Sequence, residues 1–263
     1  MNTFSKLAML GCMATTMVLS SCSDDPASTT TEKNYFPLTV GNTWTYDGIE
    51  TESKGGTATD IDTSAYMVTT KVDASLTYQG RSSYRLIDSS SNGGGAKDTT
   101  YLSKSGSQIY TYIELLPSES LSGFGVTLDL GSKWVLMADE NQTSWTILDT
   151  TITGLQIPNP LSPGTTLPGE AAIKITGSKE GTSTITAASK SVTAQEYDTK
   201  FAVTVTAAGG LLTVPFNITS KTCVSEDIGI VKRETLPTSI SVGSSAVPIN
   251  GSRETLKTYT VIK

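Results

Sequence analysis

The sequence contains no histidine and only three cysteines among its 263 residues. Without histidine, Ser-His-Asp and Cys-His catalysis, the His-Glu-x-x-His zinc proteases and nearly all zinc or copper sites are excluded. The chain also lacks a Walker loop, a Gly-x-Ser-x-Gly elbow and a Gly-x-Gly-x-x-Gly loop. We therefore expect a protein that is not an enzyme and that has neither a cofactor nor a metal site.

Positive charge is also scarce, with 19 basic against 25 acidic residues and no cluster of lysine or arginine. A sequence pI near 4.8 argues against nucleic acid as a partner and against electrostatic docking on anionic lipid. Carboxylate chemistry stays open, because glycosidases need only two Asp or Glu side chains about 5 to 10 Å apart. The sequence brings no two candidates together, and we interpret the following as solvated surface charge: Asp139, Glu140, Asp149, Glu170, Glu196 and Asp198. Asp60 and Asp62 have the spacing of a shared strand face and could contribute to a calcium site, although no EF-hand signature accompanies them.

The N-terminus has the form of an export signal. Lys6 precedes a mostly apolar stretch, 7–19, which is too short to span a bilayer as a helix but has the length of a signal h-region. It ends in Leu-Ser-Ser-Cys22. This run resembles the lipobox of bacterial lipoproteins, in which the cysteine is lipidated and becomes the mature N-terminus. The alternative is an ordinary signal peptide in which Cys22 is incidental.

The lipobox resemblance implies a signal peptide over 1–21, followed by lipidated Cys22 and a flexible, Thr-rich tether over 22–35. Mature lipoproteins carry two or three acyl chains, palmitate among them, enough for stable anchoring to membrane lipid. Ser23-Asp24-Asp25 resembles the acidic signal with which Bacteroidetes-type bacteria send lipoproteins to the outer face of the outer membrane. The resemblance implies a surface-exposed protein anchored to outer-membrane lipid; the alternative is an acidic linker.

Alternation of apolar and polar residues dominates the rest of the chain. The clearest case is the 13-residue run 66–78, in which the even-numbered residues share one face. A strand of about 43 Å must coil with its sheet, which favours a long curved sheet, half-barrel or barrel-like, over a flat sandwich. We predict an all-β, antiparallel fold with little helix apart from the signal peptide. Further strands are predicted at 43–50, 83–89, 99–103, 108–114, 133–138, 145–152, 171–177, 182–187, 201–207, 211–219, 228–234, 238–242 and 255–262.

Three smaller features bear on the organisation. The segment 155–169 carries four prolines and is predicted to be a long extended loop that could hinge two halves. Gly41-x-x-Trp44 recurs as Gly131-x-x-Trp134, which would fit an internal duplication. Cys223 is left alone once the signal and the lipid take the other cysteines, so we expect no intrachain disulfide and a buried, inert thiol.

The body of the chain opens with Pro37-Leu-x-x-Gly41-x-x-Trp44-x-Tyr46. This motif resembles the opening Pro-Leu-x-x-Gly-x-x-Trp-x-Tyr of a group of uncharacterised Bacteroidetes and Chlorobi outer-membrane lipoproteins. A Gly-Ile-Val-Lys strand, here 229–232, and a terminal Leu-Lys-x-Tyr, here 256–259, recur in that group. The three matches frame 36–263 as a single all-β domain, similar in strand pattern to the half-barrels of the lipoprotein-carrier type. Because the group has no agreed activity, the resemblance implies no catalytic residues.

Two function classes follow. In the first, the domain is a non-catalytic binding module for a glycan, a lipid or a protein, and exposed aromatic side chains supply the ligand-binding surface. The candidate ligand-binding residues are Tyr66, Tyr78, Trp134 and Trp145, with core packing as the alternative role. In the second class, the protein is a structural or assembly component of the envelope without a small ligand. An apolar concavity with uncovered aromatic side chains would favour the first class, and an interior completely filled by side chains would favour the second. Close, buried carboxylates in a cleft would favour a hydrolase.

Overall fold

The computed structural model describes residues 33–92, 97–114, 131–159, 162, 164–242 and 245–262. The predicted signal peptide, Cys22 and the predicted tether up to residue 32 lie outside the described residues, so the lipidation of Cys22 stays a prediction. Lys33–Lys263 form one compact unit. None of the helices in the described ranges has the length and apolar character needed to cross a membrane.

The described residues fold almost entirely into strands, because β-branched and aromatic residues alternate with polar ones along most of the chain. The strands are β1 (Thr43–Lys54), β2 (Thr57–Asp60), β3 (Tyr66–Tyr78), β4 (Arg81–Ser90), β5 (Lys97–Ser105), β6 (Gln108–Glu114), β7 (Ser132–Asp139), β8 (Ser144–Pro158), β9 (Thr166–Ala187), β10 (Lys190–Ala207), β11 (Leu212–Ser225), β12 (Gly229–Thr235), β13 (Thr238–Val242), β14 (Ser245–Ile249) and β15 (Gly251–Thr260). A three-residue 3-10 turn, Ala208–Gly210, joins β10 to β11.

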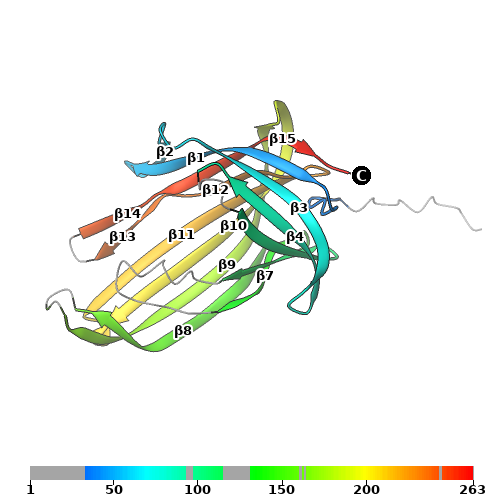
Figure 1. The fold of residues 1–263 in the computed structure, drawn as a ribbon. Coiled ribbons are helices and arrows are strands. Elements are labelled where there is room, and N and C mark those ends of the chain that lie inside the picture. The colour runs from blue at the N-terminus through cyan, green and yellow to red at the C-terminus, as the bar shows by residue number, and fades with distance from the viewer. Residues whose placement is uncertain are drawn as a thin grey trace, which may run out of the picture. The chain divides into compact units, whose positions relative to one another are not determined.

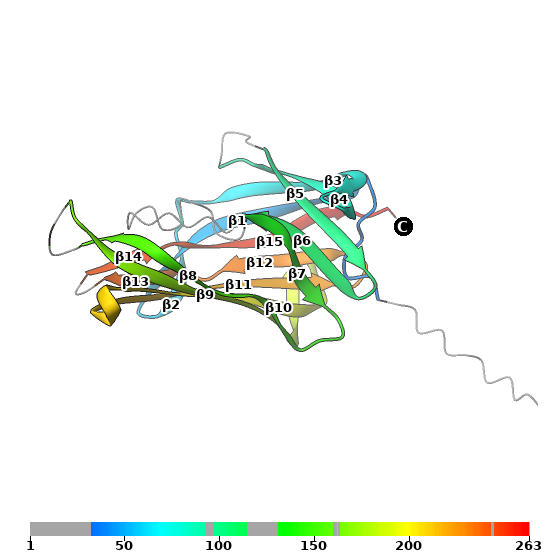
Figure 2. The ribbon, with the colours of Figure 1, turned by 90° about the horizontal axis from the view of Figure 1, so that it is seen from below.

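The strands pair antiparallel in one large sheet of order β7-β6-β5-β4-β3-β1-β15-β12-β11-β10-β9-β8, with β2 added beside β1 (Figure 1). The β13–β14 hairpin forms a separate two-stranded ribbon. Figure 2 shows β5, β6 and β7 turned obliquely to β8–β11, as right-handed strand twist requires when it accumulates over many strands. The sheet therefore coils around an interior.

The two end strands of the sheet approach one another. The short turn 140–143 joins β7 to β8, and the indole Nε1 of Trp145 on β8 donates a hydrogen bond of 2.9 Å to the carbonyl of Leu136 on β7. The sheet is thus nearly closed and barrel-like. This confirms the predicted all-β, antiparallel, curved architecture.

The predicted strand 66–78 is β3, with the predicted bounds. A bulge at Asp73 interrupts its pairing with β4, because Val72 pairs with Leu86 whereas Ala74 pairs with Arg85. An extra residue in one strand reverses the face on which later side chains lie. The prediction that the even-numbered residues share one face is therefore wrong beyond Asp73.

The predicted loop 155–169 is wrong in most of its length. Leu155–Pro158 pair with Thr166–Gly169, so a β8–β9 hairpin occupies the segment and no hinge divides the domain. Pro168 lies one residue before the pairing of β9 with β10 begins at Gly169, so its lack of an N–H group costs no hydrogen bond to β10. Pro158 and Pro168 therefore lie within the β8–β9 hairpin and do not break it, whereas Pro160 and Pro163 lie outside the described residues.

The far end of the β9–β10 hairpin folds over the outer face of the sheet. A bulge at Glu196 breaks the pairing with β9, and the Ala188 amide donates a 2.8 Å hydrogen bond to the Leu256 carbonyl on β15. Ala187 and Ala194 pack there against Cys223. The Cys223 thiol is buried, as predicted, and burial raises its pKa to about 11.

Candidate functional site

The three segments that carry the family resemblance lie side by side in the fold. They belong to β1, β15 and β12, which are consecutive in the sheet. The Trp44 indole Nε1 donates to the Ile228 carbonyl at 2.6 Å, and the Tyr46 hydroxyl donates to the Ile230 carbonyl at 3.1 Å. Gly229 has φ +99°, and a Cβ there would lie 3.3 Å from Trp44 Nε1. The glycine thus allows β12 to lie against the Trp44 ring.

These strands form part of the wall of an interior cavity of about 140 Å³. Most of its lining is apolar, and the polar side chains come from β3, β4, β5, β6, β11 and β12. The apolar lining comprises Phe36, Pro37, Leu38, Trp44, Tyr46, Leu86, Leu102, Met137, Gly229 and Ile230, and the polar lining Thr70, Asp88, Thr100, Thr111, Thr222 and Arg233. The interior is therefore not completely filled by side chains.

Phe36, Pro37 and Leu38 line one side of this cavity. Phe36 is 5% exposed and packs among residues that include Trp145 and Tyr197. The Asn34 carbonyl accepts a 2.9 Å hydrogen bond from the Asp227 amide in the β11–β12 turn. Residues 34–38 therefore hold the start of the domain against the interior of the sheet.

Arg233 on β12 places a guanidinium inside the cavity. Its Nη2 lies 2.8 Å from Glu254 Oε2, and its Nη1 lies 3.9 Å from Asp88 Oδ2. The guanidinium carbon lies 4.7 Å from the centre of the Tyr46 ring, within cation–π range. Thr70 donates a hydrogen bond from its hydroxyl to Asp88 Oδ1. The result is one cation between two carboxylates beside a mostly apolar space.

The environment shifts the titration of these groups. Burial raises the pKa of the Tyr46 hydroxyl, and the nearby Arg233 only partly opposes that effect. Burial alone would lower the pKa of Arg233, but Tyr46, Glu254 and Asp88 together hold that pKa above its ordinary value. Arg233 is therefore charged at every pH at which the protein is handled.

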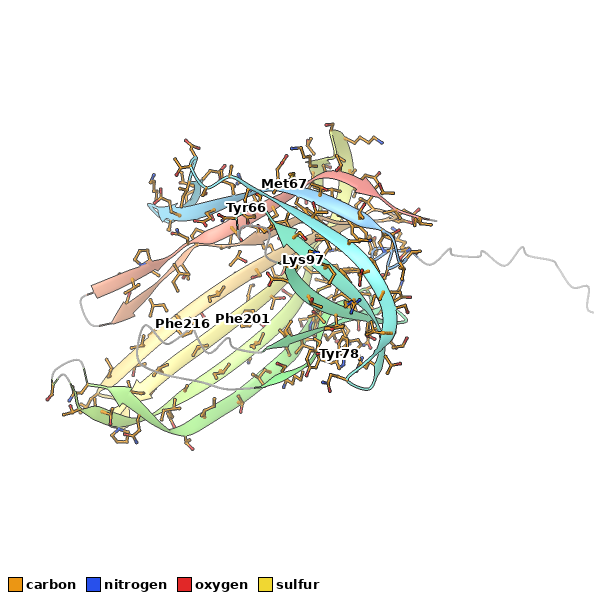
Figure 3. The ribbon with its side chains drawn as sticks, viewed as in Figure 1. Tyr66, Met67, Tyr78, Lys97, Phe201 and Phe216 are labelled. Atoms are coloured by element: carbon orange, nitrogen blue, oxygen red, sulfur yellow. The ribbon has the colours of Figure 1, made fainter. Side chains whose placement is uncertain are left out.

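Two of the four predicted ligand-binding aromatics lie apart from each other. Tyr66 lies at one end of β3 (Figure 3), with its ring flat over Gly48 and its hydroxyl 3.3 Å from Glu254 Oε1. Trp145 is 8% exposed, and its ring covers Gly177 on β9. In this structure Trp145 is a packing residue that ties β7, β8 and β9 together.

The other two predicted aromatics, Tyr78 and Trp134, come together on the outer face of the sheet. Tyr78, at the opposite end of β3 (Figure 3), stacks on Tyr101 with ring centres 3.6 Å apart. Tyr112 meets Tyr78 edge-on at 5.1 Å, and Trp134 follows at 5.5 Å from Tyr112. The indole Nε1 of Trp134 donates to the Gln79 carbonyl at 3.2 Å.

This outer aromatic cluster packs against the tip of the β3–β4 hairpin. The guanidinium carbon of Arg81, in the tip, lies 3.9 Å from the centre of the Tyr110 ring. The neighbours of the clustered rings along β5 and β6, Leu102 and Thr111, line the cavity on the opposite face. Trp134 lies on the outer face whereas Trp44 is buried in the interior. The two tryptophans of the Gly-x-x-Trp segments therefore have different environments.

Two of the candidate carboxylates, Asp139 and Asp198, are buried at 2% and 6% exposure, so the prediction that they are solvated surface charge is wrong. Asp139 accepts hydrogen bonds from Ser107, Gln108, Gln142 and the Asn141 amide, and these lower its pKa although burial opposes them. Asp60 accepts from Arg253 at 2.5 Å. No group of three or more potential metal ligands occurs in the part of the chain that the structure describes.

Sequence reasoning missed Asp88 and Arg233, which line the cavity, and Glu254, which pairs with Arg233. The available signal was the placement of Arg233 directly after the recurring Gly-Ile-Val-Lys segment, within a strand. Alternation along β12 shows that Arg233 and its neighbours lie on opposite faces, but it does not show which face borders the cavity. That depends on the register of β12 against β11, which a bulge between Cys223 and Val224 shifts.

Neither a family model nor a curated protein matches the sequence. Among solved structures, two are similar to this chain over most of its length. One is a candidate lipoprotein from Parabacteroides distasonis ATCC 8503, with 14% identity, a TM-score of 0.44, and coverage of 86% of this chain and 98% of that chain. The other is a candidate exported protein with a YmcC-like fold from Bacteroides fragilis NCTC 9343, with 13% identity, a TM-score of 0.36, and coverage of 86% and 98%.

Proposed function

We propose that the protein is a non-catalytic binding module, lipid-anchored through Cys22 at the surface of the bacterial outer membrane, which holds a small apolar ligand inside its coiled sheet. The observation that carries this proposal is the interior cavity of about 140 Å³ with a mostly apolar lining. A domain that served only as a scaffold would gain stability by filling that space, because voids forfeit dispersion contacts and cost free energy.

The size of the cavity sets the size of the ligand. An apolar cavity of about 150 Å³ stays dry and binds benzene or xenon. The cavity here is comparable, so a single ring or a short aliphatic chain fits it, whereas a glycan or a peptide segment does not. Of the three ligand classes considered, a glycan, a lipid and a protein, a lipid-like small molecule fits best.

Benzene binding tests the proposal. The full-length Cys22→Ala chain, which lacks the proposed anchor, should show a benzene-dependent rise in melting temperature, as expected for a ligand that binds only the folded state. Leu102→Phe should abolish that rise by filling the cavity, and Tyr101→Phe, on the outer face beside it, should leave the rise unchanged. A wild-type response equal to that of Leu102→Phe would refute the cavity function.

The anchor is tested separately. Cys22→Ala should move the protein from the envelope fraction to the soluble fraction, because the acyl chains supply the membrane affinity. Mass spectrometry of native material should show a mature chain that begins with an acylated Cys22. An unmodified N-terminus, or a variant that still sediments with membranes, would contradict the proposal.

A structural or assembly role is the second candidate. The interior beside β8–β11 favours it, because aliphatic side chains such as Ile173, Ile175 and Val203 fill that part, each at 1% exposure. If the cavity fails to bind apolar molecules in the benzene experiment, this role becomes the better account.

A further inference from the structure

The pair formed by Arg233 and Asp88 leaves hydrogen-bonding capacity unused at the edge of the cavity. The 3.9 Å between Arg233 Nη1 and Asp88 Oδ2 exceeds hydrogen-bond length. Asp88 Oδ1 is taken by Thr70, and Arg233 Nη2 by Glu254. Arg233 Nε is buried without an acceptor among the described residues, so the guanidinium uses few of its five donors.

The space between these two groups is suited to an atom that both accepts and donates. An oxygen placed about 2.9 Å from each would accept from Arg233 Nη1 and donate to Asp88 Oδ2, which is the capacity of a hydroxyl group. A carboxylate only accepts and would face Asp88, and an ammonium only donates and would face Arg233. A carbonyl could accept from Arg233 but would leave Asp88 Oδ2 unpaired.

The local charge also favours an uncharged ligand. Arg233 carries one positive charge, and the carboxylates Asp88 and Glu254 carry one negative charge each at neutral pH. An additional anion in this mostly apolar space would meet a net negative site. Bringing an isolated charge from water into such a space is costly unless a partner of opposite sign is free.

We infer that the cavity takes a small, uncharged, mostly apolar molecule that carries one hydroxyl group, with the hydroxyl between Arg233 and Asp88 and the apolar body against Leu86, Leu102 and Met137. This inference rests on the proposed function, because it names the ligand class of the same cavity. Hydrogen bonds to charged groups are stronger than those between neutral groups, so the hydroxyl contributes affinity as well as orientation.

Benzene, phenol and benzoate test the inference as ligands that share a ring and differ in one group. In calorimetric titrations of the full-length Cys22→Ala chain at pH 7, phenol should bind about tenfold more tightly than benzene, as a net gain from hydrogen bonds to charged partners. Benzoate should bind more weakly than benzene. Equal or weaker binding of phenol relative to benzene overturns the inference and leaves the proposed function standing, whereas absence of binding by all three overturns both.

Three variants locate the effect. Arg233→Met should reduce the phenol-to-benzene preference to about onefold, while Arg253→Met should leave it unchanged, because Arg253 pairs with Asp60 and does not line the cavity. Should Arg233→Met fail to fold, Thr70→Val provides the test, since it removes the hydroxyl that orients Asp88 at nearly constant volume and should reduce the preference severalfold. An undiminished preference in the folded variants would overturn the placement of the hydroxyl.

Discussion

The interior of the coiled sheet has two parts that differ in how they are packed. Against β8–β11 the buried side chains are aliphatic with one phenylalanine, and they pack without a charged group: Val135, Ile157, Ala171, Ile173, Ile175, Val203, Val205, Ala207, Val214, Phe216 and Ile240. Figure 3 labels Phe201 and Phe216 in this filled part. Beside β1, β12 and β15 the interior instead holds a cavity and the guanidinium of Arg233.

The difference shows that stability alone does not account for the second part. Replacing a buried ion pair by well-packed apolar residues is often neutral or stabilising, so such a pair is weak evidence for a contribution to stability. The filled part demonstrates that this fold can close its interior with Ile, Val and Phe. An arginine beside a void is therefore better explained by a ligand than by packing.

The largest expected effect on stability comes from truncating one buried side chain in each of the two parts. Ile173→Ala in the filled part should lower the free energy of unfolding by about 3 kcal/mol, because it creates a new cavity in a close-packed region. Leu102→Ala should cost less, about 2 kcal/mol, since Leu102 already borders a void and makes fewer contacts. Urea unfolding of both variants measures the difference. Equal losses would mean that the two parts are packed equally well.

Removing the cation should have the next largest effect. Arg233→Met leaves Asp88 and Glu254 without their shared partner, and we expect a loss of about 2 kcal/mol at pH 7. In the wild type the raised pKa of Arg233 keeps its contribution constant between pH 5 and pH 9. Unfolding curves at several pH values check both statements.

Substituting asparagine for two buried carboxylates outside the cavity should change the stability in opposite directions. Hydrogen bonds hold the pKa of Asp139 below its ordinary value, so its contribution is present at pH 7 and is lost as the pH falls; Asp139→Asn should cost about 2 kcal/mol at pH 7. Burial raises the pKa of Asp198 despite Lys221, so ionised Asp198 opposes folding above its unfolded pKa. Asp198→Asn should therefore change stability by less than about 1 kcal/mol at pH 7, in the stabilising direction.

The architecture followed from the sequence because alternation is a local signal. β3, β6 and β13 have the predicted bounds. The predicted strands 171–177 and 182–187 are parts of one strand, β9, and β2, β14 and the first part of β10 were not predicted. The consequences of β-bulges were not predicted from the sequence. The bulge at Asp73 moves Tyr78 to the outer face, and the bulge at Glu196 lets β10 continue as part of a long hairpin where only its second half, 201–207, was predicted. An extra residue in a strand leaves no mark in a period-two pattern.

The candidate site was predictable only in part, for a related reason. The conspicuous aromatics drew attention to Tyr78 and Trp134, which pack under a hairpin tip. The cavity depends instead on contacts between β1, β4 and β12, which are far apart in sequence. Its polar lining joins Asp88 to Arg233, and no spacing rule connects two residues that the coil of the sheet brings together.

Xenon tests the central claim most directly, because it binds apolar cavities of this size and its position can be seen. A crystal of the full-length Cys22→Ala chain under xenon pressure should show a bound atom between Leu86, Leu102 and Met137, and the same experiment on Leu102→Phe should show none there. A wild-type crystal in which side chains fill that space and xenon is absent from it would contradict the account.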